Sequence, residues 1–193
     1  MASKRLFIGI HFSEKFANEL LPWIKKIRKT ADQKEIGLKW TPAENLHVTL
    51  VFLGPTSEEQ IPDIESKIEA VILKHSTFDL KIRGIGGFPE LHRARVIYLN
   101  VQRSQKLLDL QSDLERELKD PSEFEPDYSP HLTLARLRNP KSCRDLLSPF
   151  EKIDLGKQGV SEVILYESHL AGAFPVYEML RRFPLPQDFH SES

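Results

Sequence analysis

The feature that most constrains the fold is a short segment, His-x-Thr-Leu, that occurs twice, each time within an apolar strand pattern. The first copy, with His47 and Thr49, lies in NLHVTLVFLG, and the second, with His131 and Thr133, lies in PHLTLARL. Side chains alternate between the two faces of a strand. Each copy therefore presents an imidazole and a hydroxyl on one face and apolar side chains on the other. We predict two strands, each with one face for the core and one for chemistry.

The elements around these segments also repeat in order. Strand, helix and His-x-Thr strand are predicted over 4–12, 14–30 and 38–54, and again over 95–101, 104–119 and 131–137. Ser13 is predicted to cap the first helix, Pro22 to kink or break it, and Ser57 with Gln60 to form a capping box before a later helix. Segments 160–170 and 176–185 are predicted to pair as antiparallel strands. This mixture predicts an α+β fold of two similar lobes, each contributing one His-x-Thr strand.

Composition limits the function classes. The chain has 193 residues, 27 basic and 28 acidic, with a formal net charge of −1. Proteins that grip long nucleic acid are usually strongly basic, so any contact with RNA is predicted to be local, at an end or a single phosphate. Cys143, the only cysteine, excludes internal disulfides, is interpreted as structural and fits a reducing cytoplasm. The first apolar run is too short for a signal peptide or a membrane span. We treat 1–193 as one cytoplasmic domain and expect a disordered tail over 187–193.

The repeated histidines suggest proton-transfer chemistry. Imidazole titrates near pH 6.5, so two imidazoles facing each other across a cleft can act as base and acid in one reaction. Threonine hydroxyls beside them can hold an anion, for which a phosphodiester is best suited. With 7 histidines and 6 threonines, chance predicts about 0.2 such triplets. A buried histidine paired with a polar neighbour is the alternative for one copy, but two matched copies favour function. The residues alone do not show which histidine acts as the acid and which as the base.

Arg136 and Phe7 are candidates for binding the substrate. Strict alternation places Val51 on the face of the first histidine and Phe52 on the apolar face, and it places Arg136 with the leucines. Arg136 reaches a phosphate only if its strand bulges or ends near Ala135. Phe7 offers a surface for a base, against the alternative of core packing. The chain contains no metal-binding spacing of histidines and no convincing nucleotide-binding glycine loop, so no metal or cofactor is predicted.

Five blocks, RLFIGI, NLHVTLVFLG, RVIYLNV, PHLTLARL and LYESHL, occur in the order of a known family. Together they resemble the two-histidine phosphoesterases, with their HxTx motifs, and specifically the LigT-like RNA 2′,3′-cyclic phosphodiesterases. The resemblance implies a bilobal α+β fold, in which two pseudo-symmetric lobes of antiparallel sheet with flanking helices surround a central groove that both motifs face. It also implies metal-free opening of a terminal 2′,3′-cyclic phosphate of RNA to a 2′-phosphate.

By the family pattern, His47 protonates the leaving 3′ oxygen, His131 activates water, and Thr49 and Thr133 hold the phosphate. The partners implied are RNA ends or nucleotides that carry a cyclic phosphate. One departure is His11, which stands where we expect an acidic residue. Two other functions stay open: a 2′–5′ RNA phosphodiesterase or ligase using the same site, and a non-catalytic module that binds nucleotides or RNA ends. We expect a monomer without membrane association.

Overall fold

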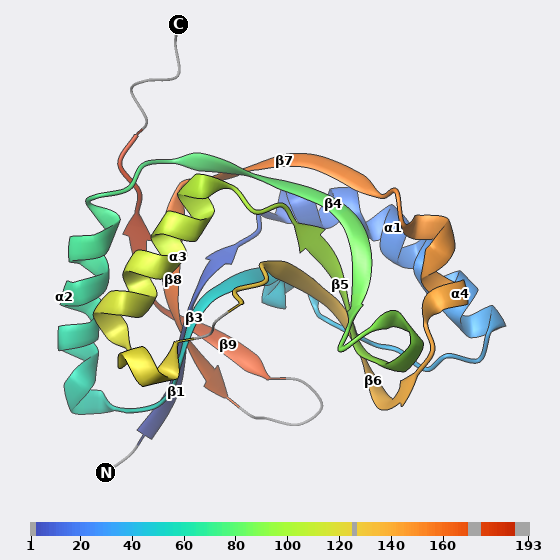
Figure 1. Cartoon of the computed structure of the whole chain (residues 1–193), viewed down its shortest axis with the longest axis horizontal. Coiled ribbons are helices and arrows are strands. Elements are labelled where there is room, and N and C mark those ends of the chain that lie inside the picture. The colour runs from blue at the N-terminus through green and yellow to red at the C-terminus, as the bar shows by residue number, and fades with distance from the viewer. Residues whose placement is uncertain (1–2, 125–126, 170–174, 188–193) are drawn as a thin grey trace, which may run out of the picture.

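The computed structural model describes residues 3–124, 127–169 and 175–187. Over these residues the chain forms helices and strands in a mixed order (Figure 1). The helices are α1 (Glu14–Gln33), α2 (Ile61–Ile72), α3 (Gln105–Leu118) and α4 (Arg144–Leu147). The strands are β1 (Ser3–His11), β2 (Lys39–Trp40), β3 (His47–Ser57), β4 (Phe78–Phe88), β5 (Ala94–Val101), β6 (His131–Lys141), β7 (Asp154–Val160), β8 (Glu162–His169) and β9 (Val176–Pro184). The predicted α+β class is confirmed.

The strands form one curled antiparallel sheet in the order β7-β4-β5-β6-β3-β1-β8-β9, with β2 added to β6 (Figure 1). The two His-x-Thr strands, β3 and β6, are neighbours at its centre. β1 pairs with β3 as β5 pairs with β6, and β8 extends one side as β4 extends the other. The two lobes are therefore pseudo-symmetric halves of a single sheet. The predicted pairing of β8 with β9 is confirmed.

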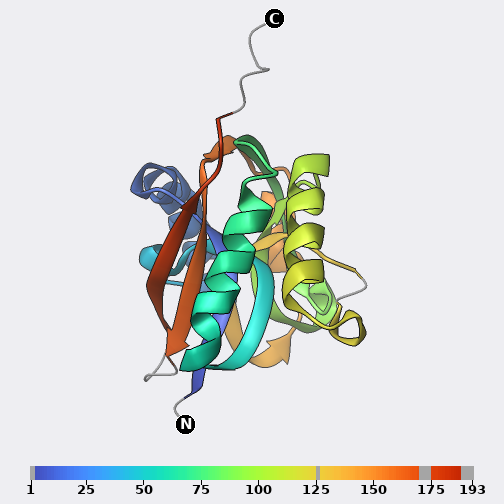
Figure 2. The same cartoon turned by 90° about the vertical axis from the view of Figure 1, so that its left-hand side faces the viewer.

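Helices cover the outer face of each lobe. α2 and α3 pack side by side against β3 and β9, and α1 packs against α4 and β7 (Figures 1 and 2). The apolar faces of the two central strands point into this core, where Val48, Leu50, Leu132 and Leu134 are buried. The opposite face is left for the His-x-Thr side chains. Over the described residues, no helix combines the length and apolar character that crossing a bilayer requires.

The helix ends follow from local sequence. Ser13 caps α1, its Oγ accepting a hydrogen bond of 3.2 Å from the Phe16 amide. The predicted box of Ser57 and Gln60 is confirmed at the short 3₁₀ turn Glu58–Gln60 that leads into α2. Of the two alternatives predicted for Pro22, the break is wrong, because α1 continues through this residue, and the kink stays a prediction. Pro22 is exposed, so water can satisfy the carbonyl that loses its amide donor.

A bulge after the motif shifts the alternation of β3. Leu50 and Val51 are both buried, and Phe52 is exposed on the histidine side. The pairing with β1 shows the extra residue, because Gly9 pairs with Thr49 but Ile8 with Val51. The expected positions of Val51 and Phe52 were therefore wrong. A bulge gives one strand an extra residue and turns the following side chains to the other face.

The same bulge occurs in β6. Leu134 and Ala135 are both buried, and the next residue, Arg136, is exposed. The register with β5 shifts at the corresponding place, where Tyr98 pairs with Thr133 and Ile97 with Ala135. The placement of Arg136 on the leucine face, which strict alternation predicted, was wrong. The strand instead bulges near Ala135, which is the condition under which Arg136 was predicted to reach a phosphate. Of the tail expected over 187–193, residues 188–193 lie outside the described residues.

Candidate active site

A groove of about 420 Å³ crosses the open face of the sheet at its centre. His47, Thr49, His131 and Thr133 all line it, as the sequence predicted. The two motifs meet because Val48 pairs with Leu132, joining β3 to β6 in antiparallel sense. This register sets His47 opposite Thr133 and His131 opposite Thr49. Each histidine is thus accompanied by the threonine of the other motif.

The two imidazoles are oriented in the same way. Nδ1 of His47 lies 2.7 Å from the carbonyl oxygen of Asn45, and Nδ1 of His131 lies 2.8 Å from that of Ser129. A carbonyl oxygen only accepts hydrogen bonds, so Nδ1 is the donor in each ring. The nitrogen left to exchange a proton with a ligand is therefore Nε2 in both histidines.

The surroundings of the two rings differ. His47 contacts Phe7, with ring centroids 4.9 Å apart, and the edge of Tyr177, 5.0 Å away. Burial lowers the pKa of His47 to about 4, opposed by its hydrogen bond to Asn45 and reinforced by the positive charges of His131, His11 and Arg136. The free protein therefore holds His47 neutral at pH 7. The His131 ring meets the edges of Phe88 and Tyr98 instead.

Phe7 forms the wall behind the first histidine. It is 3% exposed and stacks on Tyr166, with centroids 4.8 Å apart. Its ring thus has little surface to offer to a base, which matches the core-packing alternative, and its predicted role in binding substrate stays a prediction. Tyr98 is held by stacking on Phe88 at 4.2 Å.

The groove is locally basic. Arg5, Lys39 and Arg136 line it, and the described residues found around it include no aspartate or glutamate. Arg136 reaches it because of the bulge in β6. In a chain of net charge −1 this is a concentrated positive site. Such a concentration of positive charge attracts anions.

Several groove residues were not anticipated. Tyr177 and Ser168 come from β9 and β8, which reach the groove through long-range pairing with β1. Asn45 is buried, and its side-chain amide donates a hydrogen bond of 2.9 Å to the carbonyl of Pro175. Asn45 therefore links the chain entering β9 to the carbonyl that orients His47. The position of Asn45, two residues before His47, was the one feature of the sequence that could have indicated its role.

Two other residues considered in the sequence do not line the groove. His11 is half-buried and pairs with His47 across β1 and β3, and burial lowers its pKa. Cys143 is completely buried, and burial raises the pKa of its thiol. A buried thiol of raised pKa is a poor nucleophile, which agrees with the structural interpretation.

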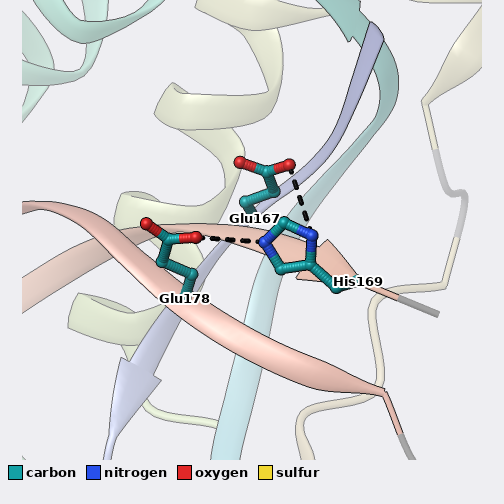
Figure 3. A group of neighbouring side chains, drawn as sticks. All are labelled: Glu167, His169 and Glu178. Atoms are coloured by element: carbon teal, nitrogen blue, oxygen red, sulfur yellow. Dashed lines mark hydrogen bonds and ion pairs between the residues drawn. The ribbon is translucent and has the colours of Figure 1, made fainter. Parts of the chain in front are cut away.

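One group of side chains has the composition of a metal site. It consists of Glu167, His169 and Glu178, whose potential metal-ligand atoms all lie within 4.8 Å of one another (Figure 3). They alternate along β8 and β9 with Ser168 and Tyr177, which face the groove, so they lie on the other side of the sheet. Lys4 already forms an ion pair of 2.7 Å with Glu167, and His169 Nε2 lies 3.1 Å from Glu178. The group is therefore a network of polar contacts, with one lysine–glutamate ion pair, away from the groove.

Comparisons with known proteins agree with the motifs. Residues 15–170 match the model of the 2'-5' RNA ligase superfamily. A Methanothermobacter thermautotrophicus protein named RNA 2',3'-cyclic phosphodiesterase is 31% identical over 185 residues, covering 94% of this chain and 98% of that protein.

The fold matches solved structures over almost the whole chain. TT0787 of Thermus thermophilus superposes with a TM-score of 0.78 at 27% identity, covering 95% of this chain and 99% of that one. E. coli LigT without ligand gives 0.76 at 25% identity, covering 97% and 100%, and LigT has also been solved with phosphate. The resemblance found in the sequence is confirmed. The chain therefore belongs to the 2'-5' RNA ligase superfamily, and within it to the family of LigT and of the proteins named RNA 2',3'-cyclic phosphodiesterase.

Proposed function

We propose that this protein hydrolyses the terminal 2′,3′-cyclic phosphate of RNA, or of a nucleotide, to a 2′-phosphate. The observation that carries the proposal is the junction of β3 and β6, where two His–Thr pairs share one basic groove. The name of the Methanothermobacter relative supports the substrate class, and the LigT complex with phosphate supports an anion site in this fold.

The proposed reaction is an in-line displacement at phosphorus. A water oxygen attacks the phosphorus atom while the bond to the 3′ oxygen breaks. His131 takes the proton of the water through Nε2, and His47 gives a proton to the departing 3′ oxygen through its own Nε2. Thr49, Thr133 and Arg136 hold the non-bridging oxygens and stabilise the charge that develops on them. The products are a 2′-phosphomonoester and a free 3′ hydroxyl.

The acid role of His47 requires a change in its pKa. In the free protein His47 is neutral at pH 7, because its pKa is about 4. A bound phosphate brings a negative charge next to the ring, and an adjacent opposite charge favours the protonated form. We propose that the substrate itself raises the pKa of His47, so that the acid forms only when the groove is occupied.

The test is incubation of the protein with an RNA oligonucleotide that ends in a 2′,3′-cyclic phosphate, in EDTA, followed by identification of the phosphate position in the product. We expect a 2′-phosphate and full activity in the chelator. Activity lost in EDTA and restored by a divalent metal would contradict the mechanism. A 3′-phosphate product would show that the 2′ oxygen leaves instead.

The superfamily name favours one second candidate, the cleavage or joining of 2′–5′-linked RNA. This second activity would place a phosphodiester between the same two histidines. Assaying a 2′–5′ oligonucleotide beside the cyclic-phosphate substrate separates the two activities. We also propose a cytoplasmic location, on the single buried cysteine, and the monomeric state stays a prediction.

A further inference from the structure

The pseudo-symmetry of the groove is broken at one position. Both central strands carry a histidine, a threonine, a bulge, and then a side chain returned to the groove face. In β6 that side chain is Arg136, and in β3 it is Phe52. Phe52 and Arg136 therefore occupy equivalent positions in the two lobes, as His47 and His131 do, but one is an aromatic ring and the other a cation.

These two residues lie at opposite ends of the groove. β3 and β6 meet at Val48 and Leu132 in antiparallel sense, so each runs away from this junction in its own direction. At about 3.3 Å per residue, Phe52 lies roughly 10 Å along β3 from Thr49. The phosphate-binding centre between the histidines is thus flanked by an aromatic end and a cationic end.

The ring of Phe52 is available to a ligand. It is 37% exposed and borders both the central groove and a neighbouring cavity of about 390 Å³. The guanidinium of Arg5 lies 4.8 Å from the ring centroid and makes no ion pair within the described part of the chain. Single exposed apolar residues are common on protein surfaces. Phe52 differs from them because it lies in a basic groove with a cation against its ring.

An exposed aromatic ring beside a cation is the usual platform for a nucleobase, because every base has a π-face that can stack on it. Phe7 offers little of this surface, since its ring is packed between His47 and Tyr166. We propose that Phe52, supported by Arg5, binds the base of the terminal nucleotide. Arg136 then marks the opposite end, and the groove accepts its substrate in one direction. This inference rests on the proposed function, which places the phosphate between the histidines.

The experiment compares 2′,3′-cyclic AMP with 1-O-methylribose 2,3-cyclic phosphate, which lacks the base. Phe52→Leu keeps an apolar side chain but removes the π-face, and Phe52→Trp keeps the π-face. Loss of base stacking lowers affinity by roughly 5- to 150-fold, so we expect Phe52→Leu to lose at least ~10-fold more kcat/KM on the nucleotide than on the base-free substrate, mainly through KM. Phe52→Trp should keep the preference for the nucleotide.

Leu73→Ala is the matched control, because Leu73 is an exposed apolar residue at the end of α2, and it should behave as the wild type. An equal loss on both substrates, or no loss on either, overturns the base subsite. If the wild type hydrolyses neither compound, the proposed function fails. The subsite is then decided by calorimetry, in which Phe52→Leu should weaken binding of 2′-AMP more than that of 1-O-methylribose 2-phosphate.

Discussion

Val48 of the first motif pairs with Leu132 of the second, and this single register places each histidine opposite the threonine of the other motif. The site is therefore assembled by neighbouring strands of one sheet. Its two imidazoles are held by the pairing of the strands that carry them and by hydrogen bonds from Nδ1 to backbone carbonyl oxygens. Both histidines are expected to be indispensable, and each depends on its own orienting carbonyl.

The first prediction concerns the two histidines. His47→Ala and His131→Ala should each lower kcat on a cyclic-phosphate RNA by at least ~10²-fold, because each removes a positioned acid or base. His92→Ala, which removes an exposed histidine outside the groove, is the control. Turnover that stays at the wild-type level in both groove variants would favour the non-catalytic binding module.

The second prediction concerns Arg136. Arg136→Ala should raise KM for the RNA end by about 10-fold or more, because it removes a charge-assisted hydrogen-bond donor to the phosphate. Arg136→Lys should recover part of this loss, since it restores the charge but not the bidentate geometry. Arg138→Ala is the matched control, because Arg138 is exposed on the same strand but does not line the groove. Equal effects of the alanine substitutions would assign Arg136 to general surface charge.

The third prediction concerns the protonation of His47. An NMR titration of its ring should give a midpoint near pH 4 in the free protein, because burial lowers its pKa to about 4. Saturating inorganic phosphate should move the midpoint upward, toward the ordinary value of about 6.5. His47→Gln identifies the resonance. A midpoint that does not respond to phosphate would reverse the proposed roles, leaving His47 as the base.

The fourth prediction concerns stability. The pKa of His47 is about 4 in the folded chain, and the ordinary value is 6.5, so the unfolded chain binds this proton more tightly. The free energy of unfolding should therefore fall as the pH drops from 6.5 to 4, by about 3 kcal/mol from this group alone. Urea unfolding at several pH values should show a smaller fall in His47→Gln than in the wild type. His92→Gln controls for removal of an imidazole, and identical pH dependence of wild type and His47→Gln would contradict the depressed pKa.

Local features of the fold were readable from the sequence. The caps at Ser13 and Ser57 depend on side chains within three residues of the helix start, and the faces of His47 and Thr49 depend only on alternation. The meeting of the two motifs was predicted from their repetition. Each of these features depends either on residues close together in the chain or on the internal repeat, and both are visible in a single sequence.

The remaining features depend on long-range pairing. Two bulges, one in β3 and one in β6, turn Phe52 and Arg136 into the groove. They are fixed by the registers with β1 and β5, which alternation within one strand does not specify. Tyr177 reaches the groove only because β8 pairs with β1 and β9 with β8. The depressed pKa of His47 likewise comes from burial, a tertiary property. The two groove histidines could therefore be located from the sequence, but the residues that surround them could not.

Each lobe is completed by elements from the other half of the chain. β4 from the first repeat completes the lobe of β5 and β6, while β8 and α3 from the second complete the lobe of β1 and β3. A half-length chain would leave its sheet edges and apolar surface uncovered. We therefore expect neither half of the chain to fold without the other.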